Sequence, residues 1–399
     1  MTETLDSTPP ALVPRPPLVT RPLMLRFVSI LGASTGFRLL LSVVPAYAAA
    51  DDGGGGGGGS AGLATGALML ATVLGELATP ALVNRYGYRA VLAVGLGLLG
   101  APTLALLLSR SLWCIIAVCL LRGAGFAFTV VAGGALTASL IPAERRGEGL
   151  AVVGIVSGAP AILAMPLGVW LAAHVGYGVV FVAGTVVALA AIPSVAALPD
   201  RLRASGQPIG IVAGLRSAEL RRPTVVFAVT AVAAGIVVTF LPLAVPSSAT
   251  ELVAVALFVQ PAASTLARWL AGRHGDRHGP AGLVLPGLLL SAGGTVLMAL
   301  TGSPVAVVLA VGVFGFGFGI AQNATSNLLY ARVPTAGYGT VSALWNVAYD
   351  VGMGVGAVGY GWVAAGTGYP WAFALTGVAM LGALVPALTD RRAVNGPGR

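Results

Sequence analysis

The sequence predicts an all-α membrane protein with twelve transmembrane helices arranged as two pseudo-symmetric six-helix halves. The first observation is composition, because 57% of the 399 residues are hydrophobic and only 9% are charged. So few charged groups could not cover the surface of a water-soluble protein of this size. The second is an internal repeat, in which Asn84-Arg85-Tyr86-Gly87 returns as Asp276-Arg277-His278-Gly279; 276 minus 84 and 279 minus 87 both give an offset of 192.

Three further motif pairs share this offset. They are Pro142 and Gly147 with Pro334 and Gly339, Gly123-Ala124-Gly125-Phe126 with Gly315-Phe316-Gly317-Phe318, and Trp170 and Gly176-Tyr177 with Trp362 and Gly368-Tyr369. Chance similarity would scatter the offsets, so duplication of a six-helix unit explains them better.

Apolar stretches of about 20 residues, each long enough to cross ~30 Å of hydrocarbon, follow one another along the chain. In the first half they cover residues 25–48, 62–83, 90–108, 112–140, 148–172 and 178–198. In the second half they cover residues 224–245, 251–271, 281–301, 304–331, 339–364 and 369–388. We expect all of them to be helices, because lipid cannot satisfy the open edge of a sheet.

The spans divide the chain into two bundles with polar segments around them. Residues 1–22 are expected to form a disordered cytoplasmic tail, 23–198 the first bundle, 199–223 a cytoplasmic linker, 224–390 the second bundle and 391–399 a second tail. The chain has no lysine, and Arg110 is the one arginine in a loop on the side away from both termini. Because cytoplasmic loops carry the excess of basic residues, we expect both termini in the cytoplasm and the protein in the plasma (inner) membrane.

Several functions are not indicated. The formal charge of +9 follows from the membrane topology, and no basic groove with interleaved aromatics points to nucleic acid. Cys114 and Cys119 lie five residues apart on one predicted helix, so we expect neither a disulfide nor a metal site. The three histidines stand at loops or helix ends without a nucleophile, so we expect no enzyme activity and no cofactor. An aromatic content of 7% does not indicate a pocket built from stacked rings.

The repeated loops carry a resemblance to a known family. The segment Gly272-Arg-His-Gly-Asp276-Arg277-His-Gly279 is similar to the loop motif of the major facilitator superfamily, and the resemblance covers essentially the whole chain. The first-half copy keeps Arg85, Gly87 and Arg89 but has Pro80 and Asn84 where the motif has glycine and aspartate. In the family this loop locks the two halves together, which implies gating roles for both copies.

The physical basis of such a lock is a carboxylate facing the positive amino-terminal end of a helix, worth about 0.3–1 kcal/mol when exposed. Asp276 would face the start of the fifth helix near Glu148, and Asn84 the start of the eleventh near Gly339. Asparagine is uncharged, so the first-half lock should be weaker. The alternative is that both loops are only tight turns with basic residues on the cytoplasmic side.

Three segments resemble motifs of proton-coupled members. Leu121-Arg122-Gly-Ala-Gly125 is similar to the arginine motif associated with proton coupling. Gly154-Ile-Val-Ser-Gly158-Ala159-Pro160 is similar to the glycine-proline motif of antiporters, although Ala159 interrupts it, and Pro45-Ala-Tyr47 resembles a helix ending common in twelve-helix exporters. Together they favour the drug and metabolite:proton antiporter branch, and export over import.

Charged residues inside the predicted spans are the candidate functional groups, since each costs at least about 2.5–3.5 kcal/mol near the membrane centre. At about 1.5 Å per residue, Arg38, Arg122 and Asp350 lie roughly 15–18 Å from the nearer helix end, and Glu76 roughly 10 Å. Arg268 is close enough to the surface to reach water, so we interpret it as structural.

By the resemblance, Arg38 and Arg122 share a wall of the central cavity and bind an anionic or zwitterionic part of the substrate. Asp350, with Tyr349 beside it and Asn346 one turn before it, is the best candidate proton carrier, and Glu76 is the other. The alternative is a permanent ion pair between Asp350 and an arginine. Further candidate substrate contacts are Asn346 and Tyr349 themselves, together with Gln260, Gln322 and Asn323, although such side chains also hydrogen-bond neighbouring helices.

The sequence therefore predicts a proton-coupled exporter of a small organic molecule, such as a drug, a secreted metabolite or a metal chelator. Its partners are a small-molecule substrate, protons and membrane lipid, and we expect a monomer. A proton-coupled importer of a small polar solute has the same fold and stays an alternative. A membrane receptor or assembly factor that lost transport is a third possibility, of a different class.

Overall fold

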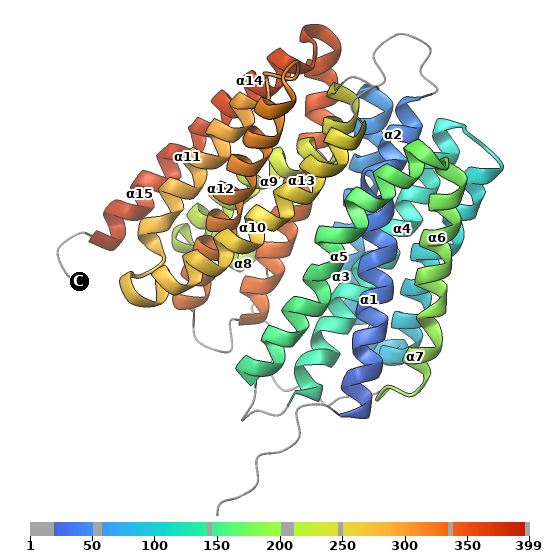
Figure 1. The fold of residues 1–399 in the computed structure, drawn as a ribbon. Coiled ribbons are helices and arrows are strands. Elements are labelled where there is room, and N and C mark those ends of the chain that lie inside the picture. The colour runs from blue at the N-terminus through green and yellow to red at the C-terminus, as the bar shows by residue number, and fades with distance from the viewer. Residues whose placement is uncertain are drawn as a thin grey trace, which may run out of the picture.

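The structure is a computed structural model that describes residues 20–50, 58–141, 146–200, 211–245, 250–333 and 338–395. Most of the two predicted tails and part of the predicted linker lie outside these residues. Within the described ranges every regular element is a helix (Figure 1). The predicted all-α class is therefore confirmed.

The first half consists of α1 to α7 and one 3₁₀ helix. Their bounds are α1 Arg21–Leu41, α2 Val43–Ala49, α3 Gly58–Gly100, η1 Ala101–Leu107, α4 Leu112–Leu140, α5 Arg146–His174, α6 Tyr177–Ala190 and α7 Ile192–Ala196. The second half consists of α8 Ile211–Arg216, α9 Ala218–Ala244, α10 Thr250–His278, α11 Ala281–Leu297, α12 Pro304–Ala331, α13 Tyr338–Thr367, α14 Tyr369–Met380, η5 Leu381–Ala383 and α15 Leu384–Asn395.

These elements supply the twelve predicted spans. Nine helical stretches of the described chain are long and apolar enough to cross a membrane. One of them, Gly58–Leu107, contains two of the predicted spans, and the shorter α11 and the 30-residue α13 supply two more. The two spans within α3 are joined at Gly87, whose φ of 84° breaks the helical path.

The internal repeat is visible in the backbone itself. Positive φ angles in the described chain occur at four glycines, Gly87 (84°), Gly176 (109°), Gly279 (81°) and Gly368 (78°). They form two pairs, each separated by the sequence offset of 192. Because glycine adopts this conformation without the steric cost of a Cβ, the same turn is retained in both halves.

The two halves lie side by side and converge at one end (Figure 1). We call the end where α1 begins the proximal end and the opposite end, where α2 ends, the distal end. Distal α3 packs closely on α13: a Cβ on Gly62 would lie 2.5 Å from the Ala357 carbonyl oxygen, and one on Gly361 2.6 Å from that of Gly58. Small residues allow this approach of the two backbones.

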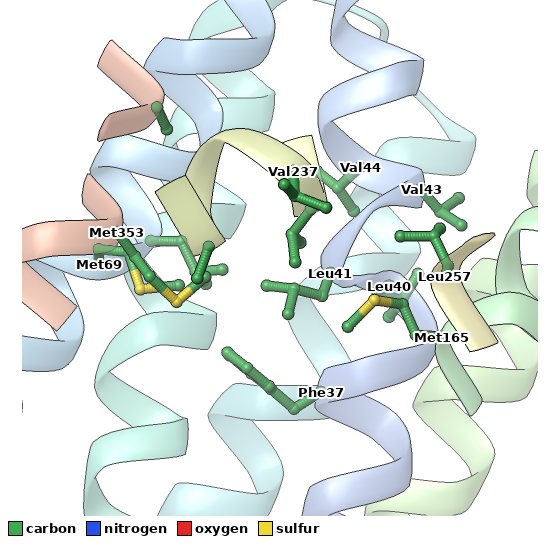
Figure 2. Packing of buried hydrophobic residues seen from close by; sticks show 14 of the residues in the cluster. Phe37, Leu40, Leu41, Val43, Val44, Met69, Met165, Val237, Leu257 and Met353 are labelled. Atoms are coloured by element: carbon green, nitrogen blue, oxygen red, sulfur yellow. The ribbon is translucent and has the colours of Figure 1, made fainter. Parts of the chain in front are cut away.

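An apolar cluster shared by both halves fills the space beside this seam (Figure 2). Leu41 and Val44 of the first half lie near Val237 of α9, and Met165 of α5 lies near Leu257 of α10. Each of these side chains is at most 2% exposed. The distal side of the molecule is therefore closed in this conformation.

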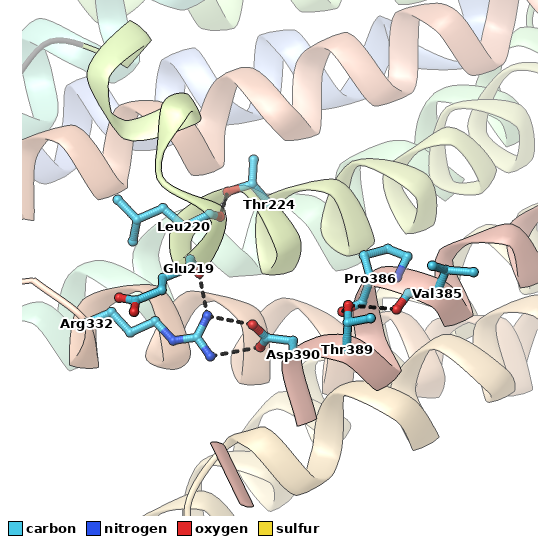
Figure 3. Close-up of polar contacts among 8 residues, drawn as sticks. All are labelled: Glu219, Leu220, Thr224, Arg332, Val385, Pro386, Thr389 and Asp390. Carbon is cyan, nitrogen blue, oxygen red and sulfur yellow. Dashed lines mark hydrogen bonds and ion pairs between the residues drawn. The ribbon is translucent and has the colours of Figure 1, made fainter. Parts of the chain in front are cut away.

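The proximal end of each half is tied by its own polar contacts. In the second half, Arg332 at the end of α12 binds both oxygens of Asp390 on α15, at 3.0 and 2.8 Å, and also donates to the Glu219 carbonyl of α9 (Figure 3). In the first half, the backbone N–H groups of Tyr88 and Arg89 donate to Asp200, at 3.0 and 3.2 Å. Each half is thereby held as a unit at the end where the halves diverge.

Candidate functional site

Two carboxyl groups from opposite halves meet inside the molecule. Glu76 of α3 and Asp350 of α13 place their carboxyl groups close enough to share a hydrogen bond when one of them is protonated, and Asp350 is only 6% exposed. Ionised carboxylates only accept hydrogen bonds, so a bond between two carboxyls requires a proton on one of them. The Oε2 atom of Glu76 is buried without a hydrogen-bond partner. The arrangement can hold one shared proton at the boundary between the halves.

A cationic group completes this cluster. Arg38 of α1 interacts electrostatically with Tyr349 and Asp350 of α13. With one shared proton on the two carboxyls, the group formed by Glu76, Asp350 and Arg38 has no net charge. Loss of that proton leaves a net negative charge, which is costly in a medium of low dielectric constant. The cluster's protonation and its contacts across the halves are therefore linked.

The partly buried Arg38 and the fully buried Arg122 are held differently. Arg122 of α4 is 0% exposed, and its Nη2 donates to the carbonyls of Gly36 and Phe37 on α1 at 3.4 and 3.5 Å. Its Nε and Nη1 are buried with no hydrogen-bond partner. Phe37 stacks on Phe126 of α4 with 3.7 Å between ring centroids. Arg122 thus links α4 to the backbone of α1 beside Arg38, with donors left over.

The predicted polar residues of α10 and α12 form a separate group. Gln260 is 8% exposed, and Gln322 and Asn323 are partly buried. Asn323 accepts a 3.0 Å hydrogen bond from Asn327 of the same helix. In the described part of the chain no hydrogen bond joins these side chains to the carboxyl pair. Asn346 is partly buried on α13, one turn before Asp350.

A cluster of stacked rings lines the second half beside the carboxyl pair, which the overall aromatic content did not indicate. Phe227 of α9 stacks on Trp345 of α13 with centroids 4.5 Å apart, and lies 6.1 Å from Tyr349 and 6.2 Å from Phe318 of α12. The Nε1 of Trp345 is buried without a hydrogen-bond partner. The i,i+4 spacing of Trp345 and Tyr349 was the available signal, since it places both rings on one helix face.

The repeated loops lie at the proximal end, as the resemblance implies. Gly87 lies against Asp200 of its own half, where a Cβ would be 2.5 Å from Oδ1. Arg89 also donates to the Leu198 carbonyl, whereas Asn84 and Arg85 are exposed.

In the second copy of the loop, Arg277 is exposed and Gly279 repeats the positive φ of Gly87, while Gly272 packs near Asn323. The structure does not describe the side chains of Asp276 and Glu148 or the exposure of Gly339. The proposed lock between the halves thus stays a prediction.

Two cavities adjoin these groups. One, of about 670 Å³, lies along the seam of α3 and α13 and has Asp350 in an otherwise apolar wall that includes Leu70 and Val355. The other, of about 260 Å³, lies between α1, α4 and α5 and includes Arg26. In the described chain no cluster of His, Cys, Asp and Glu could hold a metal ion.

Two pseudo-symmetric helical halves that meet at a buried charged cluster define a multi-pass membrane protein of the transporter class. The family model of the Major Facilitator Superfamily matches residues 26–357 and 248–398, so the chain belongs to this superfamily. The family and its solved relatives point to a transporter rather than an enzyme.

Solved structures with this fold share little sequence with the chain. The nucleoside transporter NupG is 13% identical, with a TM-score of 0.71 over 95% of this chain and 100% of that one. A POT family transporter in complex with 5-aminolevulinic acid is 11% identical, with a TM-score of 0.75 over 94% and 96%. A bacterial homologue of the human lysosomal transporter Spinster, inward-facing and unoccupied, is 13% identical, with a TM-score of 0.71 over 93% and 95%. No curated protein matches the sequence.

Proposed function

We propose that this protein is a proton-coupled secondary transporter that exports a small organic solute by alternating access. The observation that carries the proposal is the proximity of the Glu76 and Asp350 carboxyls, which can hydrogen-bond across the two halves only while they share a proton. Movement of one half against the other separates these groups, so the proton's occupancy and the conformation bias each other. The two carboxyls are the proposed proton carriers.

The surrounding groups suggest how a solute is coupled to the proton. An ammonium group placed at the carboxyl pair would displace the shared proton, as antiport requires, while a carboxylate on the same solute would pair with Arg38. An anion without an ammonium group would instead favour retention of the proton, as symport requires. A zwitterionic or cationic solute therefore fits export, and an anionic solute fits the alternative, import.

The orientation is part of the proposal. The arginines of the predicted loops gather on the proximal side, so this side is proposed to face the cytoplasm of a plasma (inner) membrane. The distally closed conformation is then the inward-facing one. The proposal of export over import is based on the motifs around Arg122 and Pro160. The protein is also proposed to act as a monomer.

The experiment measures proton release or uptake by the purified full-length protein in weakly buffered detergent with a pH-sensitive dye. Three solutes of similar size are added separately: butylamine, 4-aminobutyrate and butyrate. Proton release with the amine or the zwitterion, absent in Asp350→Asn and in Glu76→Gln, supports antiport at this pair. Uptake with butyrate alone supports symport instead. Calorimetric binding of any of the three without proton exchange contradicts coupling at these carboxyls.

A further inference from the structure

Arg26 is a second buried cation, although it lies only two positions inside the first predicted span, residues 25–48. Its side chain is 4% exposed. Nε donates to the Gly133 carbonyl and the Thr137 hydroxyl at 3.2 and 3.1 Å, Nη1 to the Ser29 hydroxyl at 2.5 Å, and Nη2 to the Thr129 carbonyl at 3.3 Å. A guanidinium carries five N–H donors, so this neutral set of acceptors leaves two of them free.

The guanidinium packs against Gly133 of α4, in the space that a side chain at this position would fill. A Cβ on Gly133 would overlap Nη2 of Arg26, so a larger residue at this position would displace the guanidinium from its present place. The neighbouring Gly134 has no atom within 4 Å of its own ideal Cβ. A substitution to alanine would therefore disturb Arg26 at Gly133 but not at the adjacent Gly134.

The guanidinium site at Gly133 adjoins a cavity. Arg26 lines the cavity of about 260 Å³ between α1, α4 and α5, together with the hydroxyl residues Ser34, Thr129, Thr137 and Ser157. No carboxylate belongs to this lining, and no described carboxylate forms an ion pair with Arg26. A buried positive charge without a counter-charge is costly unless an anion joins it. The hydroxyls of Thr129, Thr137 and Ser157 already donate to carbonyls of their own helices, so the free guanidinium donors are the groups left for an anion. Guanidinium groups are donors with which proteins bind carboxylate and phosphate.

We infer that this cavity binds a carboxylate or phosphate group, with Arg26 as the charged ligand. The cavity lies in the proximal part of the first half, between the proximal end and the level of the carboxyl pair. If the proposed function holds, the anion belongs to the transported solute, and the site binds this solute as it enters or leaves the protein on the proximal side. The site itself requires only that an anion can reach Arg26.

The opposing interpretation is that Arg26 only clamps α1 to α4. A clamp accounts for the four hydrogen bonds, but it needs neither a charge that lacks an ion-pair partner among the described residues nor a cavity at the guanidinium. It predicts that loss of Arg26 changes stability and leaves anion binding unchanged.

The test is isothermal titration of the purified full-length protein with inorganic phosphate, at fixed pH and ionic strength. We expect saturable binding to the native chain and to Gly134→Ala. Arg26→Gln should abolish it. Gly133→Ala, which retains the charge but displaces the guanidinium, should weaken it by about tenfold or more. Absence of saturable binding to the native chain, or unchanged binding to the Arg26 and Gly133 variants, overturns the inference.

Two further arms keep the result decisive. If Arg26→Gln does not fold, the pair Gly133→Ala and Gly134→Ala decides, because both keep every charge of the chain. Asp350→Asn should bind phosphate as the native chain does, so failure of the proton-coupling proposal would not affect this measurement. If phosphatidylglycerol added to the micelles competes with phosphate, the site is an anion site for lipid, and its assignment to a soluble solute is wrong.

Discussion

Glu76 and Asp350 come from opposite halves of the molecule, and their carboxyl groups lie side by side next to the seam between α3 and α13. The cavity wall around Asp350 is otherwise apolar, so this pair is a point where a charge change acts on the packing of one half against the other. Apolar contacts such as those of Figure 2 favour the distally closed state by an amount that does not depend on pH. The carboxyl pair adds a contribution that depends on a proton.

The first prediction concerns the effect of pH on conformation. Sharing of a proton stabilises the distally closed state, and its loss places two carboxylates side by side, so rising pH should populate other states. Spin labels at positions 84 and 277, both exposed at the proximal end, report the distance between the halves in a background lacking Cys114 and Cys119. The distance distribution measured at about pH 5 should differ from that measured at about pH 9. A tenfold change in the ratio of the two populations corresponds to ~1.4 kcal/mol.

The amide variants supply the control for this experiment. Asp350→Asn and Glu76→Gln retain a hydrogen-bond donor without a titrating proton, so each should hold the distally closed distribution at both pH values. A pH-dependent distribution that persists in both variants would assign the effect to other groups and remove the pair from the coupling proposal.

The second prediction concerns the glycine contact at the seam. Gly62→Val would place side-chain atoms against the Ala357 carbonyl, because even a Cβ would lie 2.5 Å from it. The distal seam should open, and a cysteine introduced at the buried Thr65 should react with a maleimide at least about tenfold faster. Gly359→Val on α13 is the matched control, since nothing lies within 4 Å of its ideal Cβ. Equal labelling rates in the two variants would contradict the seam's role in distal closure.

The third prediction concerns the ion pair at the proximal end of the second half. Arg332 and Asp390 have side chains 13% and 7% exposed, so removal of one partner leaves a poorly hydrated charge. Asp390→Ala should lower the stability of the protein in detergent by about 2 kcal/mol, measured by thermal unfolding. The double variant Arg332→Met/Asp390→Leu should recover much of this loss, because no unpaired charge remains. Arg391→Gln at an exposed neighbouring position is the control and should change little.

The sequence was sufficient for the fold because its signals are local and repeated. The apolar segments of membrane-spanning length and the turn glycines at a fixed offset can be recognised in the sequence alone, and Gly87 and Gly279 do share a positive φ. The second predicted span and most of the third lie in α3, which consists of two helices that meet at the kink at Gly87. Whether two helices joined by a single turn residue are assigned as one element or two depends on the state given to that residue, here Gly87.

The site was less accessible from sequence because it depends on which faces meet. Glu76 and Asp350 were each predicted as proton carriers, but 274 residues separate them, and their contact follows from the packing of α3 on α13. Arg26 was not among the predicted site residues because it lies five residues from the first residue of α1, and its burial follows from its contacts with Gly133, Thr137 and Thr129 of α4. The stacked rings around Phe227 come from three helices and have no common motif.

The last prediction uses the repeated turn glycines to measure backbone strain separately from contact. At Gly87 the φ of 84° disfavours a Cβ, and Asp200 also fills the space where it would stand. At Gly279 the φ of 81° is similar, but nothing lies within 4 Å. Gly279→Ala should therefore lose about 1–3 kcal/mol through strain alone, and Gly87→Ala should lose more.

Gly97→Ala serves as the reference for this comparison, because Gly97 lies within the helical part of α3 with open space around its ideal Cβ. Alanine there should stabilise the helix by about 0.5–1 kcal/mol. Thermal unfolding of the three variants in one detergent gives the order of stability, with Gly97→Ala highest and Gly87→Ala lowest. Equal losses at Gly87 and Gly279 would show that Asp200 yields to the new methyl group, so that the first-half loop is no more firmly anchored than the second.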